Sequence, residues 1–171
     1  MYLPDALNRV LRSFERYYNI EKEHPAAPFA AEAAFFSHDE QYFLIRAARL
    51  SQSDSGEYVF FAMEENLDED TFERLDRAAW ETGMERTDPG PGHMRTDVAL
   101  VILTNGISPE VIRKIRSRSH SRSYRFGLRG WSNYRLVVIE AEKGRAFHNR
   151  LGADLAKLLG NISSKEQPGS A

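Results

Sequence analysis

Two runs of almost uninterrupted apolar residues occur in the second half of the chain. Residues 98–104 have the sequence VALVILT, and residues 136–139 have the sequence LVVI. A strand with one face in water alternates apolar and polar residues, so runs without alternation predict strands that are covered on both faces. We expect both strands to lie in the middle of a sheet.

Helical spacing of apolar residues predicts four helices. Pro4, Asp68 and Pro109 suit the first turns of three of them, and Gly83 suits the end of the second. The expected helices cover residues 3–18, a segment that begins after Asn66 or Asp68 and stops at Gly83, a short segment from Ser108 to about 117, and residues 151–162.

Shorter β-prone runs complete the pattern. We expect a short strand at 29–37 and a hairpin formed by 41–50 and 57–63 around the turn-rich segment 51–56. Asn105-Gly106 is expected to end the strand at 98–104. Residues 126–131, which contain two glycines, predict a bent strand or a wide loop.

The element order predicts an α/β (α+β) fold in which a mixed central sheet is sandwiched between helices. With 171 residues the chain suits one domain, which we place at 1–162. Residues 163–171 are polar, and we expect them to form a disordered tail.

The order helix, three strands, helix, strand over residues 1–104 resembles the core of the restriction-endonuclease-like PD-(D/E)XK family. Catalytic members of that family hold a divalent metal with an Asp and a Glu-x-Lys on adjacent strands. The expected strand from Glu57 to Glu65 contains no lysine, and Glu140-Ala-Glu142-Lys143 has the residue types at another spacing in another strand. The resemblance therefore implies a non-catalytic relative.

Charge divides the chain into two unlike parts. Residues 1–92 carry 9 basic and 19 acidic groups, whereas residues 93–171 carry 14 and 6. This asymmetry favours an anionic partner for the second half, attraction between two parts of one fold, or a homo-oligomer. The chain has no cysteine, no apolar run of membrane-helix length and no nucleotide motif. We therefore expect a cytoplasmic protein that needs no cofactor or membrane.

The positive charge is concentrated between Val111 and Ile139, where no Asp or Glu occurs. Its eight cations are Arg113, Lys114, Arg116, Arg118, Arg122, Arg125, Arg129 and Arg135. Aromatic residues, including Phe126 and Trp131, lie among them, and this combination suits phosphate contacts with base stacking. Alternatively, these arginines cover the acidic face of the helix at 68–85 or are simply solvated.

Candidate catalytic groups are fewer and carry no ligand motif. His93, Asp97 and His148 are the most plausible titratable residues, with His120 as a further imidazole. No metal site is predicted, because no spacing such as His-Glu-x-x-His is present. Capping and turn hydrogen bonds explain His93 and Asp97 equally well.

Near the last helix, Asn149 is expected to act as a cap, and Arg150 to face the carboxyl ends of the strands.

Two hypotheses follow. The first is a non-enzymatic binding module whose cationic edge meets a polyanion, such as a nucleic acid, or an acidic protein. Its expected binding residues are Arg116, Arg118, His120, Arg122, Arg125, Arg129, Trp131, Asn149 and Arg150. The second is a divergent metal-dependent nuclease or other hydrolase. It would use residues from the set His93, Asp97, Glu140, Glu142, Lys143 and His148.

Overall fold

The computed structural model describes residues 1–36 and 54–163. Along the chain the elements are α1 (Leu3–Arg12), β1 (Asn19–Glu21), β2 (Ala31–Phe36), β3 (Asp54–Leu67), α3 (Glu69–Arg86), β4 (His93–Ile107), α4 (Pro109–Ser117), β5 (Ser121–Ser123), the 3₁₀ turn η2 (Arg125–Gly127), β6 (Trp131–Glu140), β7 (Arg145–His148) and α5 (Ala153–Ser163).

The described strands form one mixed sheet, in agreement with the predicted fold class. Its order is β1-β2-β3-β4-β6-β5, and β7 also pairs with β6. The central strands β3, β4 and β6 are parallel, and the strands outside them pair in antiparallel fashion. β5 and β7 lie beside opposite ends of β6, because β5 pairs with residues 131–133 and β7 with residues 137–140.

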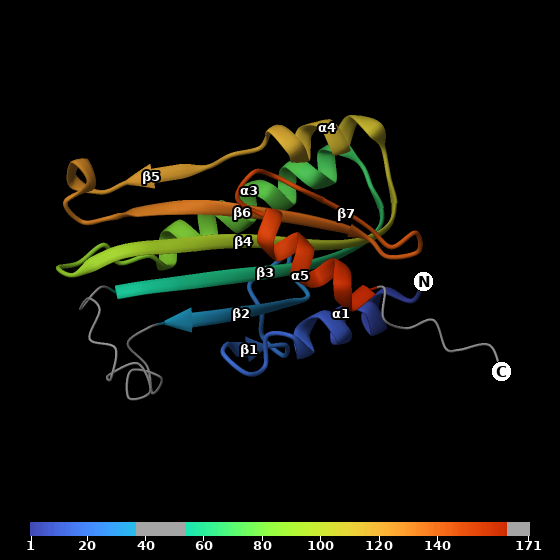
Figure 1. Cartoon of the computed structure of the whole chain (residues 1–171), viewed down its shortest axis with the longest axis horizontal. Helices are drawn as coiled ribbons and strands as arrows, with labels where there is room; N and C mark the ends of the chain where they lie inside the picture. Colours follow the sequence, from blue (N-terminus) through green and yellow to red (C-terminus); the bar gives the residue numbers. More distant parts are fainter. Residues whose placement is uncertain (37–53, 164–171) are drawn as a thin grey trace.

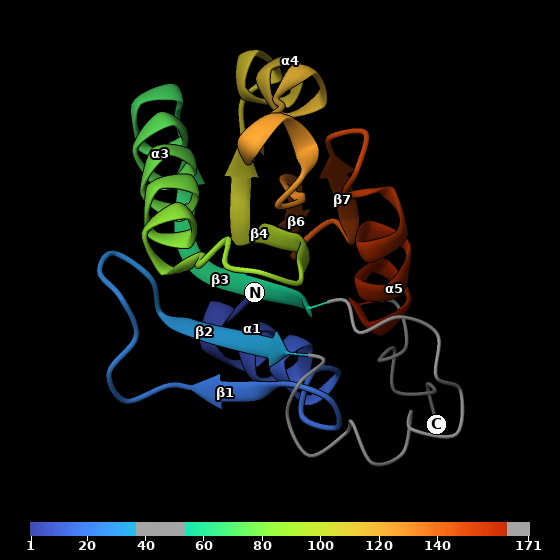
Figure 2. The same ribbon diagram turned by 90° about the vertical axis from the view of Figure 1, so that its left-hand side faces the viewer.

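Helices cover both faces of the sheet (Figures 1 and 2). α1 and α5 pack on one face, where Val101 and Leu103 belong to the same apolar cluster as Leu7 and Leu159. α3 and α4 pack on the other face, where Leu100 and Ile102 meet apolar residues of both helices. Residues 98–103 of β4 are at most 1% exposed. The prediction of a strand covered on both sides is therefore confirmed.

The helix starts follow the predicted chemistry. The Asp68 carboxylate accepts a hydrogen bond from the Thr71 amide at 2.8 Å and caps α3. Ser108 caps α4 in the same way, with Pro109 in the first turn. The predicted stop at Gly83 is wrong, because α3 continues to Arg86. Gly83 lies against β4, and a Cβ there would be only 2.4 Å from Val98 Cγ2.

Several strand boundaries differ from the predictions. The strand predicted at 29–37 is β2, but Asn105-Gly106 does not end β4, because β3 continues to Leu67 and pairs with β4 as far as Ile107. β7 was not predicted. β7 forms a hairpin with β6, in which Glu140 pairs with Arg145 and Val137 pairs with His148, but its four residues show no alternation of apolar and polar positions that would predict a strand. The strand predicted at 41–50 and most of the tail at 163–171 lie outside the described residues.

Candidate functional site

A β-hairpin formed by β5 and β6 carries the largest exposed part of the cationic segment. Its tip, residues 124–130, lies at one extreme of the long axis of the molecule (Figure 1). Backbone hydrogen bonds close the tip, from the Tyr124 amide to the Gly130 carbonyl at 3.0 Å and from the Arg129 amide to the Tyr124 carbonyl at 3.1 Å. The wide loop predicted at 126–131 is thus a tightly bonded turn that precedes β6.

The backbone of this tip adopts a conformation that most residues avoid. Arg125 and Phe126 have φ values of 46° and 55°, and Gly127 has 87°. Left-handed backbone at two consecutive side-chain-bearing residues costs on the order of 1–3 kcal/mol each and persists only where the surroundings hold it. The hydrogen bonds of the tip supply part of that restraint.

His93 supplies further restraint from the first residue of β4. Its Nδ1 donates to the Arg129 carbonyl oxygen at 2.5 Å, and its Nε2 lies 2.8 Å from Thr96 Oγ1. The ring also meets the edge of the Tyr124 ring, with centroids 5.5 Å apart. Since His93 is only 7% exposed and has both nitrogens engaged, the structure gives it a positioning role for the tip.

The surface that the tip presents is both apolar and cationic. Phe126 is 104% exposed and Leu128 is 85% exposed, while Trp131 at the start of β6 is 42% exposed. Arg122 and Arg125 are exposed beside them, and Arg129 is half-buried. In the described part of the chain, these three arginines form no ion pair with a carboxylate. Large apolar side chains exposed together mark interaction sites more often than chance placement does.

Other members of the predicted cationic edge face inward. Arg118 NH1 donates to Glu73 and to Asp76, each at 2.9 Å, and His120 Nε2 lies 2.8 Å from Asp76. The side chain of Asp76 is only 2% exposed. Lys114 likewise pairs with Glu69 and Glu73 on α3. Arg118 and His120, which the sequence analysis named as binding residues, are therefore paired within the chain, because α4 and the segment after it pack against the acidic face of α3.

The hydrogen bonds of Arg118 also affect the acid that receives them. They hold the pKa of the Glu73 carboxyl below its ordinary value. His120 is stacked on Trp80 with centroids 5.3 Å apart, so its ring is part of the packing on this face. The alternative in which the cations cover the acidic helix therefore describes this part of the segment.

Asp97 belongs to a buried ion-pair cluster on the α1/α5 face of the sheet. Arg135 contacts Glu57 at 3.2 Å and Asp97 at 3.1 Å, and Tyr18 donates its hydroxyl hydrogen to Glu57 at 2.8 Å. Arg95 contacts Asp97 at 3.3 Å. Burial raises the pKa of both Glu57 and Asp97, and the nearby arginines only partly oppose this effect.

A cavity of about 220 Å³ adjoins this cluster. Arg95, Asp97 and Arg135 line it from the sheet, and Arg150 and Asp154 line it from the segment leading into α5. Asp97 pairs with both Arg95 and Arg135, and because the lining combines both signs of charge, the cavity has no dominant charge.

The residues of the hydrolase hypothesis do not gather in one place. Asp97 pairs with Asn133, whereas Glu140 lies seven residues farther along β6, roughly 23 Å away at strand spacing. Glu140 is occupied by Lys143 and Arg145 in the turn to β7. Glu142 is exposed in that turn, and His93 lies under the hairpin tip. Among the described residues, no three His, Asp or Glu side chains are arranged to hold a metal ion.

Asn149 is a structural residue. Its Oδ1 accepts from the amides of Leu136 and Gly152, and its Nδ2 donates to the carbonyls of Tyr134 and Arg118, at distances between 2.9 and 3.1 Å. It is 2% exposed, and its side-chain hydrogen bonds hold the backbone of this region together, while its expected role in binding stays a prediction. It also does not cap α5 directly, because the amide that it accepts from belongs to Gly152, before the helix begins.

Arg150 lies toward the amino ends of the parallel strands, beside Arg95 and Asp97. The prediction that it faces the carboxyl ends is wrong, because β7 runs back along β6 before the chain enters α5. Arg150 also lines a second cavity together with Arg116 and His148. The fold thus brings together three residues that the sequence analysis named separately.

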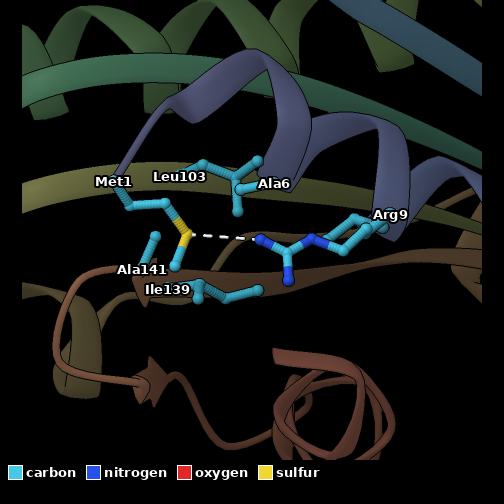
Figure 3. Close-up of a pocket in the computed structure, with 7 residues that line it drawn as sticks. Met1, Ala6, Arg9, Leu103, Ile139 and Ala141 are labelled. Atoms are coloured by element: carbon cyan, nitrogen blue, oxygen red, sulfur yellow. Dashed lines mark hydrogen bonds between the residues drawn. The ribbon is translucent and has the colours of Figure 1, made fainter. Parts of the chain in front are cut away.

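An apolar pocket beneath the amino end of α1 is too small for a ligand (Figure 3). It has a volume of about 20 Å³, which is close to the space of one water molecule. Ala6, Leu103 and Ile139 line it, and Met1 covers it with its sulfur 3.4 Å from Arg9. No described helix combines the length and apolar character needed to cross a membrane.

Comparison with known proteins gives a family without an assigned activity. Residues 4–161 match the model of a family described as a domain of unknown function (DUF8052). No curated protein and no solved structure matches the chain.

Proposed function

The chain belongs to this family of unknown function, and we propose from its site geometry that it is a non-enzymatic binding module whose hairpin tip contacts single-stranded nucleic acid. The observation that carries the proposal is the tip itself. Three arginines without carboxylate partners in the described residues surround Phe126, Leu128 and Trp131, which are 104%, 85% and 42% exposed.

Charge and exposed rings together favour this partner over a merely acidic protein surface. Arg122, Arg125 and Arg129 can each meet a backbone phosphate, and Phe126 and Trp131 can stack on bases whose faces are not covered by a second strand. A duplex offers fewer free base faces. The bonded tip favours binding, because a preformed loop loses little conformational freedom when the partner arrives.

Self-association through the charge division receives less support. A second copy would have to offer the acidic residues of α3 to the cationic segment. These residues are already paired within the same chain, where Lys114, Arg118 and His120 contact Glu69, Glu73 and Asp76. The proposal includes a cytoplasmic location, where single-stranded nucleic acid is accessible.

The proposal is tested by fluorescence anisotropy of a labelled oligo-dT strand titrated with the full chain over a series of salt concentrations. Three phosphate contacts predict a slope of log K against log salt of about −2. Phe126→Ala is expected to weaken binding about 5- to 150-fold, the range for the loss of one stacked base. Arg125→Glu is expected to abolish most of the remaining affinity at moderate salt.

Arg77→Glu is the matched control, because Arg77 is an exposed arginine in the middle of α3 and belongs to neither strand nor the tip of the hairpin. It changes the net charge by the same amount and should leave binding within about twofold if the tip is the site. Equal weakening by Arg77→Glu and Arg125→Glu, or binding insensitive to both tip variants, would overturn the proposal. So would binding of anionic phospholipid vesicles, but not of the oligonucleotide, through the same tip residues.

A further inference from the structure

A second cationic site lies far from the hairpin tip. The last turn of α4 and the segment 146–150 border an open cavity of about 330 Å³, within the size range of small-ligand sites. Its lining consists of Arg116, Ala146, Phe147, His148, Asn149 and Arg150. His148 pairs with Val137 of β6, six residues from Trp131, which places the cavity roughly 20 Å along the strand from the tip.

The lining contains cationic groups and no carboxylate. Arg116 and Arg150 form no ion pair within the described residues. Most nearby arginines do: Arg118 pairs with α3, Arg135 with Glu57 and Asp97, and Arg145 with Glu140. Two guanidinium groups that share a cavity repel each other, and an anion placed between them removes that repulsion.

The floor of the cavity is held rigidly. Asn149 fixes the backbone at four points through its side-chain hydrogen bonds to Tyr134, Leu136, Arg118 and Gly152. His148 Nδ1 donates to the Asn149 carbonyl at 2.7 Å, because a carbonyl oxygen only accepts. The base of the Arg150 side chain therefore starts from a defined position, as a preorganised site requires.

We propose that this cavity binds a phosphate group, held between the guanidinium groups of Arg116 and Arg150. A guanidinium presents paired N–H donors that match two oxygens of one phosphate, and two such groups from different elements surround it from two sides. Phe147 adds an apolar wall that suits the organic part of a phosphate monoester. The phosphate is either free in solution or part of such a monoester, and the recognition chemistry is the same for both.

Isothermal titration of the full chain at constant ionic strength, with inorganic phosphate and with phenyl phosphate as probes, tests the proposal. Saturable one-to-one binding is expected. Arg116→Gln and Arg150→Gln should each weaken it at least about tenfold, the effect of losing one charged hydrogen-bonding partner. Tighter binding of phenyl phosphate identifies an organic monoester as the ligand type, and equal binding identifies free phosphate.

Arg113→Gln is the matched control. Arg113 lies on the same helix and is also exposed, but it pairs with Glu110 and does not line the cavity. The affinity of the Arg113→Gln variant for both probes should match that of the unaltered chain. Urea unfolding should show that all three variants remain folded. The proposal is overturned if neither probe binds at millimolar concentration, or if Arg113→Gln weakens binding as much as the other two.

The same variants separate this proposal from the proposed function. Arg116→Gln and Arg150→Gln should leave oligonucleotide binding unchanged, while Phe126→Ala should leave phosphate binding unchanged. Loss of both activities in the Arg150 variant would show that the cavity belongs to the nucleic-acid surface, and would overturn the assignment of a separate phosphate site.

Discussion

His93 and Arg129 are 36 residues apart in the chain, yet the imidazole of His93 donates a hydrogen bond to the carbonyl oxygen of Arg129 at 2.5 Å. This contact joins the start of β4 to the tip of the β5–β6 hairpin. It turns an exposed loop into a fixed platform for Phe126 and its neighbours.

His93→Phe keeps a ring at this position but removes both hydrogen bonds. We expect a loss of about 1–3 kcal/mol in the free energy of unfolding, because a partly buried carbonyl loses its donor. Hydrogen exchange of the amides in residues 124–130 should accelerate, and oligonucleotide binding should weaken even though every tip residue is intact. His24→Phe, at an exposed position, serves as the control. Unchanged exchange at the tip would show that His93 does not hold it.

Asn149→Ala should be among the most destabilising single substitutions on the α4/β7 side of the sheet. It leaves two carbonyls and two amides without their partner in a buried position. At a cost of about 1–3 kcal/mol for each unsatisfied group, partly relieved by water, we expect at least about 3 kcal/mol by urea unfolding. Asn8→Ala, on the exposed side of α1, should change stability by no more than about 0.5 kcal/mol. Similar small losses in both variants would contradict the structural role of Asn149.

Two helical glycines should respond to alanine with opposite signs. At Gly83 the new Cβ would lie 2.4 Å from Val98 Cγ2, so Gly83→Ala should cost about 1–3 kcal/mol through overpacking. At Gly160 a Cβ meets no atom within 4 Å, so Gly160→Ala should stabilise the protein by up to about 1 kcal/mol through helix propensity. Thermal unfolding of both variants checks the pair, and a stabilised Gly83→Ala would mean that α3 does not pack this closely on β4.

Stability should depend on pH with opposite signs at two glutamates. Burial raises the pKa of Glu57, so its contribution to stability is complete below its pKa in the unfolded chain, about 4.3, and is lost as pH rises through the higher folded value. Arg118 lowers the pKa of Glu73, so its contribution is complete above the unfolded value and is lost on acidification.

Both contributions are measured by urea unfolding of the unaltered chain, Glu57→Gln and Glu73→Gln between pH 3 and 8. This pH range brackets the ordinary pKa of a glutamate. The free energy of unfolding of the unaltered chain, relative to that of Glu57→Gln, should fall as pH rises. The free energy of unfolding of the unaltered chain, relative to that of Glu73→Gln, should increase as pH rises. Parallel differences in the two variants would contradict the assigned environments.

The fold class was predictable because its main signals are local. Residues 98–104 and 136–139 have no polar alternation, and only strands in the middle of a covered sheet accept that pattern. Asp68 and Ser108 mark helix starts because their side chains accept hydrogen bonds from amides of the same turn, and Pro109 marks one because its fixed φ suits the first helical position. Gly83 led to a wrong prediction of where α3 ends, because a sequence does not distinguish a glycine that ends a helix from one that fits against a neighbouring strand.

The use of each charge was decided by the tertiary structure. The sequence by itself determined a cationic, acid-free interval between Val111 and Ile139, together with aromatic residues. It did not determine that Arg118 faces Asp76, that Arg135 lies between two buried carboxylates, or that Arg122 and Arg125 remain exposed. Those outcomes depend on which elements pack together, and an ion pair acts over a few ångströms in space whatever the separation of its partners along the chain.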